Sequence, residues 1–292
     1  VPTLIKSPAW IRPIRSLFKL LDIVPGYKEP ETRSAFLIFF SLFFGILVND
    51  AGYGLVFLIL TIVLRRKFRN APAEPFKLFG LLSACAIVWG ALTGSYFGID
   101  RLPAPMKTIE ISWLKNETNF MAFAFLIGAV HLTVAHAWRA LMVINSVRAL
   151  AQLGWILVIW SAYFLARMLI LGMMLPAWFL WVCVTGISLV VLFMTPVRKL
   201  KTEWADHIML PFDFIGAFAD LVSYVRLFAV ASASMAVAEA FNELATHKGI
   251  HSWQSGLIAV VILSIGHGLN IMLALMSILV HGVRLNTLEF SS

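Results

Sequence analysis

One arginine lies near the middle of a long apolar stretch, where a charge is costly. The stretch runs from Phe212 to Ala245 and reads FDFIGAFADLVSYVRLFAVASASMAVAEAFNELA. At helical spacing Arg226 shares one face with small side chains, namely Ala219, Ser223, Val230, Ala233, Val237 and Ala240. Small residues let another helix approach closely. The pattern indicates either an arginine paired within its own protein or one that is presented to a partner helix.

Three acidic residues accompany this arginine. Asp213 lies thirteen residues before Arg226 and Glu239 thirteen residues after it, a separation of about 20 Å along a helix axis. Asp220 lies six residues before Arg226, not directly on its face. An acid near each membrane surface, with a fixed cation between them, suits two aqueous paths that must not join. The alternative is that Asp213 and Glu239 are interfacial charges at helix ends.

Polar residues also follow one stripe of the last apolar stretch, Gly266 to Phe290. Steps of three and four connect His267, Asn270, Ala274, Ser277, His281 and Arg284. A single intramembrane histidine is more often a packing residue than a proton carrier. Five polar residues on one stripe favour an ion path, because random placement would expose several of them to lipid.

Four further residues have a polar side chain in or beside an apolar run. Asp50 follows Asn49 in a break between the first two runs, where it either serves the ion path or caps the next helix. His131 and His136 either line an ion path or are packing residues, and packing is the favoured interpretation. Arg167 either lines such a path or, as the favoured interpretation, is an interfacial side chain whose charged end reaches toward water.

The elements that must hold these residues are membrane-spanning helices. Of the 292 residues, 60% are hydrophobic and 13% are charged, which exceeds the apolar content that one soluble core uses. The length suits about eight spans of roughly 20 residues. We expect helices near 35–49, 52–65, 78–98, 119–144, 150–172, 176–194, 211–245 and 252–289. The predicted fold class is therefore all-α and polytopic, with helices 7 and 8 long and tilted.

The charge distribution predicts the orientation. The net charge is +8, but the basic residues lie at the ends of apolar runs, which argues against a nucleic-acid partner. With eight spans, 17 of the 23 Lys and Arg residues fall on the side of both termini, which predicts cytoplasmic termini. Residues 1–33 are predicted as a basic amphipathic juxtamembrane segment, followed by a transmembrane domain over 34–292. Since the chain begins at Val1, we expect that a preceding region is missing.

Three segments resemble a known family: FFGILVNDAGYGL (44–56), SYVRLFAVASA (223–233) and HGVRLNTLEF (281–290). The family is the C-terminal membrane domain of subunit a of vacuolar-type ATPases, called subunit I in archaeal and bacterial A/V-type enzymes. The resemblance extends over essentially the whole chain. It implies a non-catalytic stator in the lipid bilayer of a prokaryotic plasma membrane. Its partners would be a rotor ring of proteolipid subunits (c or K), each with one ionisable carboxylate, and the peripheral-stalk and central-stalk subunits.

The resemblance also implies roles for individual residues. Arg226 falls on the family's indispensable arginine and Arg284 on its second arginine. The guanidinium would favour the ionised form of each passing rotor carboxylate and, being always charged, would block a leak between the two half-channels. The predicted ion-translocating residues are Asp50, Asp213, Asp220, Ser223, Arg226, Glu239, His267, Asn270, Ser277, His281 and Arg284. No cofactor or metal is expected, because Cys85 and Cys183 lack CxxC partners and no Gly-rich phosphate loop is present.

The chain departs from the family in two places. Eukaryotic members have a glutamate ten residues before the second arginine, where this chain has Ala274. Either Glu239, Asp50 and His267 supply the external path, or water and neutral ligands carry the ion. Asn49 replaces the first glycine of the family's GD-x-G-x-G turn. The family's large N-terminal cytoplasmic arm is expected to be the preceding region that this chain does not include. The residues do not distinguish H⁺ from Na⁺, because the ion site is expected on the rotor.

Two other functional classes compete with this reading. A secondary ion-coupled transporter would have inverted repeats and paired broken helices, whereas only the break at 49–52 is evident. An intramembrane enzyme would need a motif such as HExxH, whereas His131 and His136 form only HxxxxH.

Overall fold

A computed structural model describes residues 11–20, 33–99, 108–195, 204–247, 249 and 252–289. All regular elements within these residues are helical, which confirms the all-α prediction. The α-helices are α1 (Ile14–Leu20), α2 (Arg33–Val48), α3 (Ala51–Lys67), α4 (Ala73–Thr93), α6 (Glu117–Met142), α7 (Arg148–Leu171), α8 (Phe179–Phe193), α9 (Trp204–Val222), α10 (Val225–Thr246) and α11 (Trp253–Ser277). A short 3₁₀ helix, η1 (Ser112–Lys115), precedes α6, and the π-helical segments η3 (Ile278–Gly282) and η4 (Leu285–Glu289) follow α11. Of the predicted basic segment over 1–33, residues 1–10 and 21–32 lie outside the described residues.

Among the residues that the structure describes, five helical stretches are long and apolar enough to cross a membrane. They are Ala73–Thr93, Glu117–Met142, Arg148–Leu171, His207–Thr246 and Trp253–Thr287. The helices α2 and α8 are apolar but shorter. Large apolar side chains are exposed on these elements, for example Trp181 on α8 and Met272 on α11, as expected where lipid replaces water. The chain is therefore a membrane protein, and the number eight for its spans stays a prediction.

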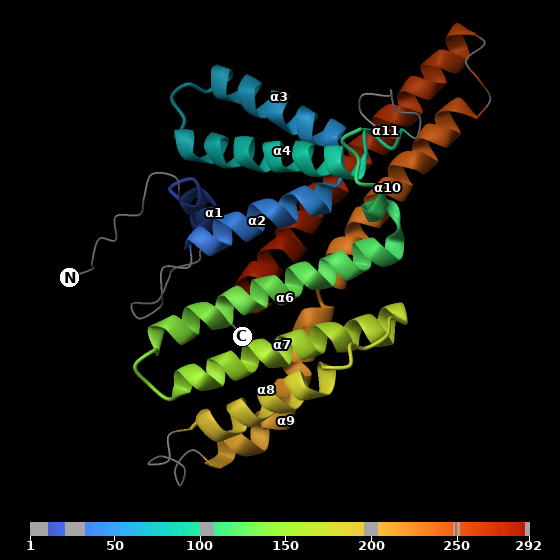
Figure 1. Cartoon of the computed structure of the whole chain (residues 1–292). Coiled ribbons are helices and arrows are strands. Elements are labelled where there is room, and N and C mark those ends of the chain that lie inside the picture. Colours follow the sequence, from blue (N-terminus) through green and yellow to red (C-terminus); the bar gives the residue numbers. More distant parts are fainter. Residues whose placement is uncertain are drawn as a thin grey trace. The chain divides into compact units, whose positions relative to one another are not determined.

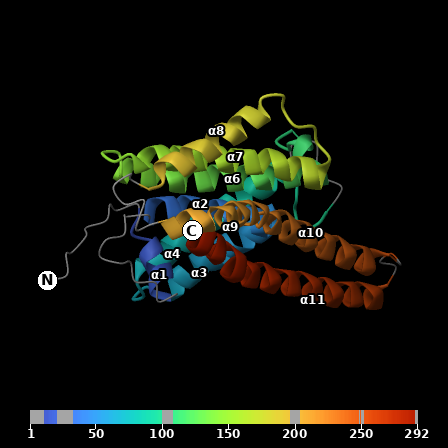
Figure 2. The ribbon, with the colours of Figure 1, turned by 90° about the horizontal axis from the view of Figure 1, so that it is seen from below.

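The chain divides into two compact units, of which the first comprises residues 1–112 and 229–286. Within it α2, α3 and α4 pack together, with α3 and α4 side by side (Figure 1). The part of α10 that belongs to this unit lies beside α11 (Figure 2). The segment η3 packs against α2. This unit holds most of the polar residues of the last apolar stretch.

The turn between α2 and α3 requires an unusual residue at its first position. Asn49 has a left-handed backbone with φ of 48°, a conformation that glycine adopts freely and that asparagine tolerates better than most residues. Its side chain accepts a hydrogen bond of 3.0 Å from Trp89 Nε1. Gly90 allows the turn to approach α4, because a Cβ there would overlap the Ala51 amide. Asparagine can therefore replace the family's glycine at this position.

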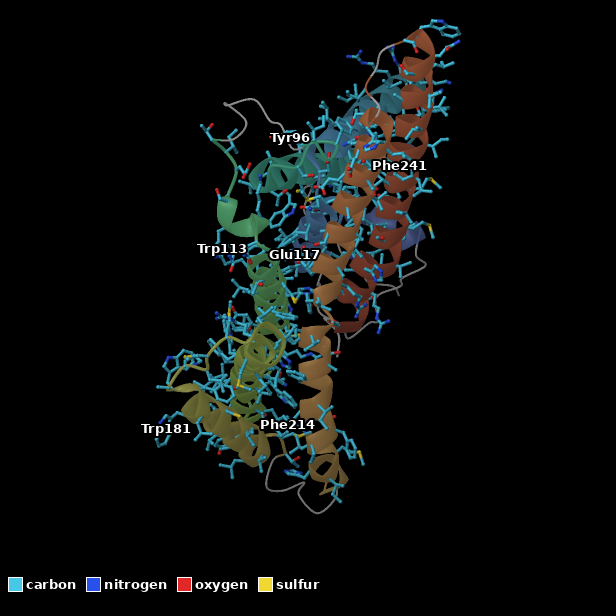
Figure 3. The ribbon with its side chains drawn as sticks, turned by 90° about the vertical axis from the view of Figure 1, so that its right-hand side faces the viewer. Tyr96, Trp113, Glu117, Trp181, Phe214 and Phe241 are labelled. Carbon is cyan, nitrogen blue, oxygen red and sulfur yellow. The ribbon has the colours of Figure 1, made fainter. Side chains whose placement is uncertain are left out.

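The second unit comprises residues 113–228 and 287–292. Its helix α7 packs against α6, α8 and α9. Val158, Val190 and Leu210 form a buried apolar cluster, against which partly buried residues pack. One of these is Phe214 of α9, labelled in Figure 3, whose ring centroid lies 5.2 Å from that of Trp155 on α7. The packing fixes α9, and with it the chain that leads to Arg226.

The two long C-terminal helices differ from the sequence prediction. The helix expected over 211–245 lies within the 40-residue stretch His207–Thr246, but a turn at Ser223 and Tyr224 divides it into α9 and α10. The helix expected over 252–289 is α-helical only as far as Ser277 and then continues in π-helical turns. The helix expected over 78–98 begins at Ala73 and ends at Thr93, because Gly94 caps it with a left-handed φ of 72°.

Candidate functional site

The break between α9 and α10 replaces α-helical hydrogen bonds by shorter-range ones. In an uninterrupted helix the Asp220 carbonyl would accept from the Tyr224 N–H. Here the Tyr224 N–H donates to the Leu221 carbonyl at 3.2 Å, and the Ser223 hydroxyl donates to the Asp220 carbonyl at 2.6 Å. The Leu227 N–H likewise donates to the Tyr224 carbonyl at 3.0 Å, three residues back. The chain therefore tightens to a 3₁₀-type turn immediately before Arg226.

This turn also determines how the Arg226 side chain is held. The Ser223 carbonyl accepts from the Arg226 N–H at 3.2 Å and from the Arg226 Nε at 3.1 Å. The second bond fixes the guanidinium at its inner nitrogen, whereas the terminal nitrogens carry the donors suited to a carboxylate. Arg226 is half-buried. The serine, the turn and the arginine of SYVR thus form one local arrangement.

Tyr224, at the centre of the break, is fully buried and bound to α6. Its hydroxyl lies 2.6 Å from Nδ1 of His131, which is also fully buried. The ring of Tyr224 occupies the space above Gly128, where a Cβ would lie only 2.6 Å from it. His131 is therefore an interior hydrogen-bonded residue, as its interpretation as a packing residue expects. Sequence reasoning did not assign Tyr224 a role, although it lies within a segment that carries the family resemblance.

A second polar cluster lies within the first unit, between α3, α10 and α11. Asn270 is fully buried. Its Nδ2 donates to the Tyr53 hydroxyl at 3.1 Å and to the Ser234 carbonyl at 2.8 Å. Its Oδ1 accepts from the Ser234 hydroxyl at 3.0 Å. The Tyr53 hydroxyl lies 2.7 Å from Nδ1 of His267. Because an amide nitrogen only donates, Tyr53 accepts from Asn270 and has its own proton available for His267.

Asp50 adjoins this second cluster and caps α3. Its Oδ1 accepts from the Tyr53 N–H at 3.0 Å and its Oδ2 from the Ser95 hydroxyl at 3.0 Å. The capping role that sequence reasoning held as the alternative is thus confirmed. Burial raises the pKa of the Asp50 carboxyl above its ordinary value, and the hydrogen bonds that the carboxyl accepts, chiefly from Tyr53 and Ser95, lower it only in part. The carboxylate also acts electrostatically on His267.

The remaining predicted residues lie elsewhere on their helices. Asp213 is exposed on α9, and Glu239 is half-buried on α10. Ser277 and His281 are half-buried, and Arg284 is exposed between the two π-helical segments. The structure therefore groups Asp220, Ser223 and Arg226 at the helix break, and Asp50, His267 and Asn270 in the second cluster.

The π-helical turns alter the polar stripe of the last helix. Buried positions recur every four residues at Gly266, Asn270, Ala274, Ile278 and Gly282. Steps of three and four describe the stripe only as far as Ser277, because η3 and η4 widen the hydrogen-bonded turn to five residues. Arg284 accordingly departs from the face that a regular helix would give it. Segments of this kind are frequent at functional sites.

Sequence reasoning missed three residues of the second cluster: Tyr53, Ser95 and Ser234. Each is a single polar residue in a largely apolar segment, a pattern that ordinary packing also produces. Tyr53 does lie in the first segment that carries the family resemblance, and this was the only signal available for it. Among the described residues, no three or more His, Cys, Asp or Glu side chains gather as a metal site requires.

The fold and these clusters define a polytopic helical membrane protein that holds ionisable side chains within its membrane-crossing helices. Comparison with known proteins finds homologues. Over its whole length the chain is 33% identical to the V-type ATP synthase subunit I of Borreliella burgdorferi and 33% identical to the V-type ATP synthase subunit I 1 of Treponema pallidum. It is 25% identical to the A-type ATP synthase subunit I of Methanocaldococcus jannaschii. The chain is thus a homologue of V-type and A-type ATP synthase subunits I, which confirms the resemblance.

The match covers only part of these relatives. The chain spans 52%, 50% and 47% of the three proteins, or about half their length. No family model matches the chain.

Proposed function

We propose that this chain is the membrane-embedded stator of a rotary V-type or A-type ATPase, and that it conducts H⁺ or Na⁺ past a rotor ring. The relatives, which match the whole length of this chain, are named as subunits of V-type and A-type ATP synthases. One observation carries the proposal beyond the names. Arg226 lies at a helix break inside a 40-residue apolar stretch, where its Nε donates to the Ser223 carbonyl at 3.1 Å.

The proposed mechanism is electrostatic. Each rotor subunit of the proteolipid ring brings one carboxylate to Arg226, and the guanidinium favours the ionised form, so that the bound ion leaves. Because arginine stays charged, it also prevents ions from crossing directly between the two half-paths. ATP chemistry belongs to other subunits of the complex, which bind this chain through the peripheral and central stalks.

The external half-path is proposed to use the Tyr53 and His267 pair. The last helix lacks an acid at Ala274, which is buried with 2% of its surface exposed. His267 is half-buried and hydrogen-bonded to Tyr53, with the Asp50 carboxylate acting on it. An imidazole can accept and release a proton, which is the chemistry that such a path requires. On the other side of the membrane, the exposed Asp213 is proposed to serve the cytoplasmic half-path, and Arg284 to assist Arg226.

The test of this function is Arg226→Ala in the assembled complex. The purified complex would be reconstituted in vesicles, and ATP-driven acidification and Na⁺ uptake measured. We expect no ion transport while assembly is retained.

Arg167→Ala is the matched control. Arg167 also lies in a membrane-crossing helix, where its guanidinium contacts Met173 Sδ at 2.9 Å and the Tyr163 ring at 5.4 Å. This variant should transport normally. Near-normal transport by Arg226→Ala would eliminate the proposed role, and transport driven by a solute gradient without ATP would favour a secondary transporter.

A further inference from the structure

The tight turn before Arg226 needs a structural cause. Its hydrogen bonds span three residues, a geometry poorer than that of an α-helix. If the chain reverted to an α-helix, the Ser223 carbonyl would turn to the Leu227 N–H, and its bond to Arg226 Nε would compete with that donor. The local sequence offers no proline or glycine that would enforce the break, since residues 217–230 contain neither. The Ser223 hydroxyl, which donates to the Asp220 carbonyl, competes locally with the helix, and tertiary contacts add to this effect.

Helix α6 supplies such contacts on both sides of the arginine. Tyr224, two residues before Arg226, is hydrogen-bonded to His131 of α6. Phe228, two residues after Arg226, packs edge-to-face on Phe120 of α6 with 5.6 Å between ring centroids. Residues four apart on a helix share a face, and the residue midway between them lies on the opposite side. Two contacts with α6 therefore direct Arg226 away from α6.

The Tyr224 contact is specific to this position. A fully buried tyrosine hydroxyl needs a hydrogen-bond partner, because leaving it unsatisfied is costly in a membrane interior. His131 provides that partner at 2.6 Å, and Gly128 leaves room for the ring. A one-residue shift of Tyr224 along the helix would rotate the ring away from both. The hydroxyl thus fixes the register of the turn.

We propose that the hydrogen bond between Tyr224 and His131 positions Arg226 by fixing the turn from which the Ser223 carbonyl holds the guanidinium. His131 and Tyr224 are positioning residues, and neither has to touch the ion or the rotor carboxylate. The inference rests on the proposed function of Arg226.

The test compares three variants of the assembled complex in vesicles. Tyr224→Phe removes only the hydroxyl, and His131→Leu removes its partner. His131→Asn keeps a polar atom two bonds from Cβ, where the imidazole has Nδ1, and should restore the bond. The readout is the number of ions transported per ATP hydrolysed. We expect Tyr224→Phe and His131→Leu to lower this ratio about three- to tenfold, because loss of one intramembrane hydrogen bond shifts the equilibrium between the turn and a regular helix by about this factor. His131→Asn should stay within about twofold of the wild type.

His136→Leu is the control for general damage to α6. Its Nδ1 lies 2.8 Å from Gln152 Oε1, and its ring stacks on Trp155, so it makes a comparable contact away from the break. This variant should keep the wild-type ratio, because a structural defect lowers transport and hydrolysis together. If Tyr224→Phe and His131→Leu keep the wild-type ratio while Arg226→Ala is inactive, the inference is refuted and the proposed function stands. An active Arg226→Ala would instead overturn the proposed function.

Discussion

Two substitutions of Asp50 test the cluster around Tyr53, because they separate the effect of the α3 helix cap from the effect of the carboxylate charge. Only 3% of its surface is exposed, and its carboxylate accepts hydrogen bonds that include those from the Tyr53 N–H and the Ser95 hydroxyl. Asp50→Asn keeps an oxygen acceptor for the Tyr53 N–H and offers Nδ2 to the Ser95 hydroxyl. Asp50→Ala removes both acceptor oxygens and leaves the Tyr53 N–H and the Ser95 hydroxyl without them.

The expected magnitudes follow from these contacts. Loss of the cap costs about 1–2 kcal/mol, and the unpaired buried hydroxyl of Ser95 adds about 1–3 kcal/mol. Asp50→Ala should therefore destabilise the protein by about 2–5 kcal/mol, and Asp50→Asn by less than about 1 kcal/mol. Burial raises the folded-state pKa of Asp50. The stabilisation that this shift gives is present below the ordinary aspartate pKa and is lost as pH rises through the raised pKa. At neutral pH the asparagine, which carries no charge, avoids that loss.

The assay is denaturant unfolding of the purified complex in detergent, followed by tryptophan fluorescence at neutral pH. The expected order of stability places Asp50→Asn at or near the wild type, and Asp50→Ala well below both. If Asp50→Asn were as unstable as Asp50→Ala, a charge at this position would hold the fold, and the capping argument would be refuted. Transport by Asp50→Asn separates function from folding, because the proposed external path predicts slower transport in a fully stable complex.

Other substitutions test the remaining parts of the account. His267→Gln can accept a hydrogen bond from Tyr53 but cannot carry a proton, so transport should fall sharply with assembly intact; normal proton transport would exclude His267 from the path. Asp213→Asn and Glu239→Gln should each slow ion flux when ions are supplied from one side of the membrane only. If both variants match the wild type in such measurements, the half-path assignment fails. Asn49→Gly should lie within about 1 kcal/mol of the wild type in unfolding, because relief of the left-handed backbone offsets the lost hydrogen bond; a loss above about 3 kcal/mol would contradict this balance.

The sequence predicted most helices because each apolar run between charges has the length of a membrane span. It did not predict the break at Ser223 and Tyr224. That break has no proline or glycine as a local signal, and its partner His131 lies 93 residues away in the sequence. The π-helical turns after Ser277 were missed for a related reason, since a stripe counted at α-helical steps assumes a regular helix throughout.

The candidate site was predicted unevenly. Capping by Asp50 followed from a local rule, because an aspartate immediately before a helix is a common N-cap. The pairing of Tyr53 with His267 joins residues 214 positions apart, which no local pattern encodes. Arg226 was evident from its charge alone, but the turn that holds its Nε could not be predicted, because it involves a contact with His131, 93 residues away.

Cross-linking tests the central claim most directly, which is that the Arg226 side of α10 meets a moving partner. Ala233 follows Arg226 by seven residues on the same face of α10 and is exposed, whereas Met235 is exposed on the opposite side. Each would be changed to cysteine after Cys85→Ser and Cys183→Ser, with a second cysteine placed beside the rotor carboxylate. We expect Ala233→Cys to form a disulfide with the ring that stops rotation, and Met235→Cys to form none. Cross-linking from Met235→Cys but not from Ala233→Cys would contradict the account.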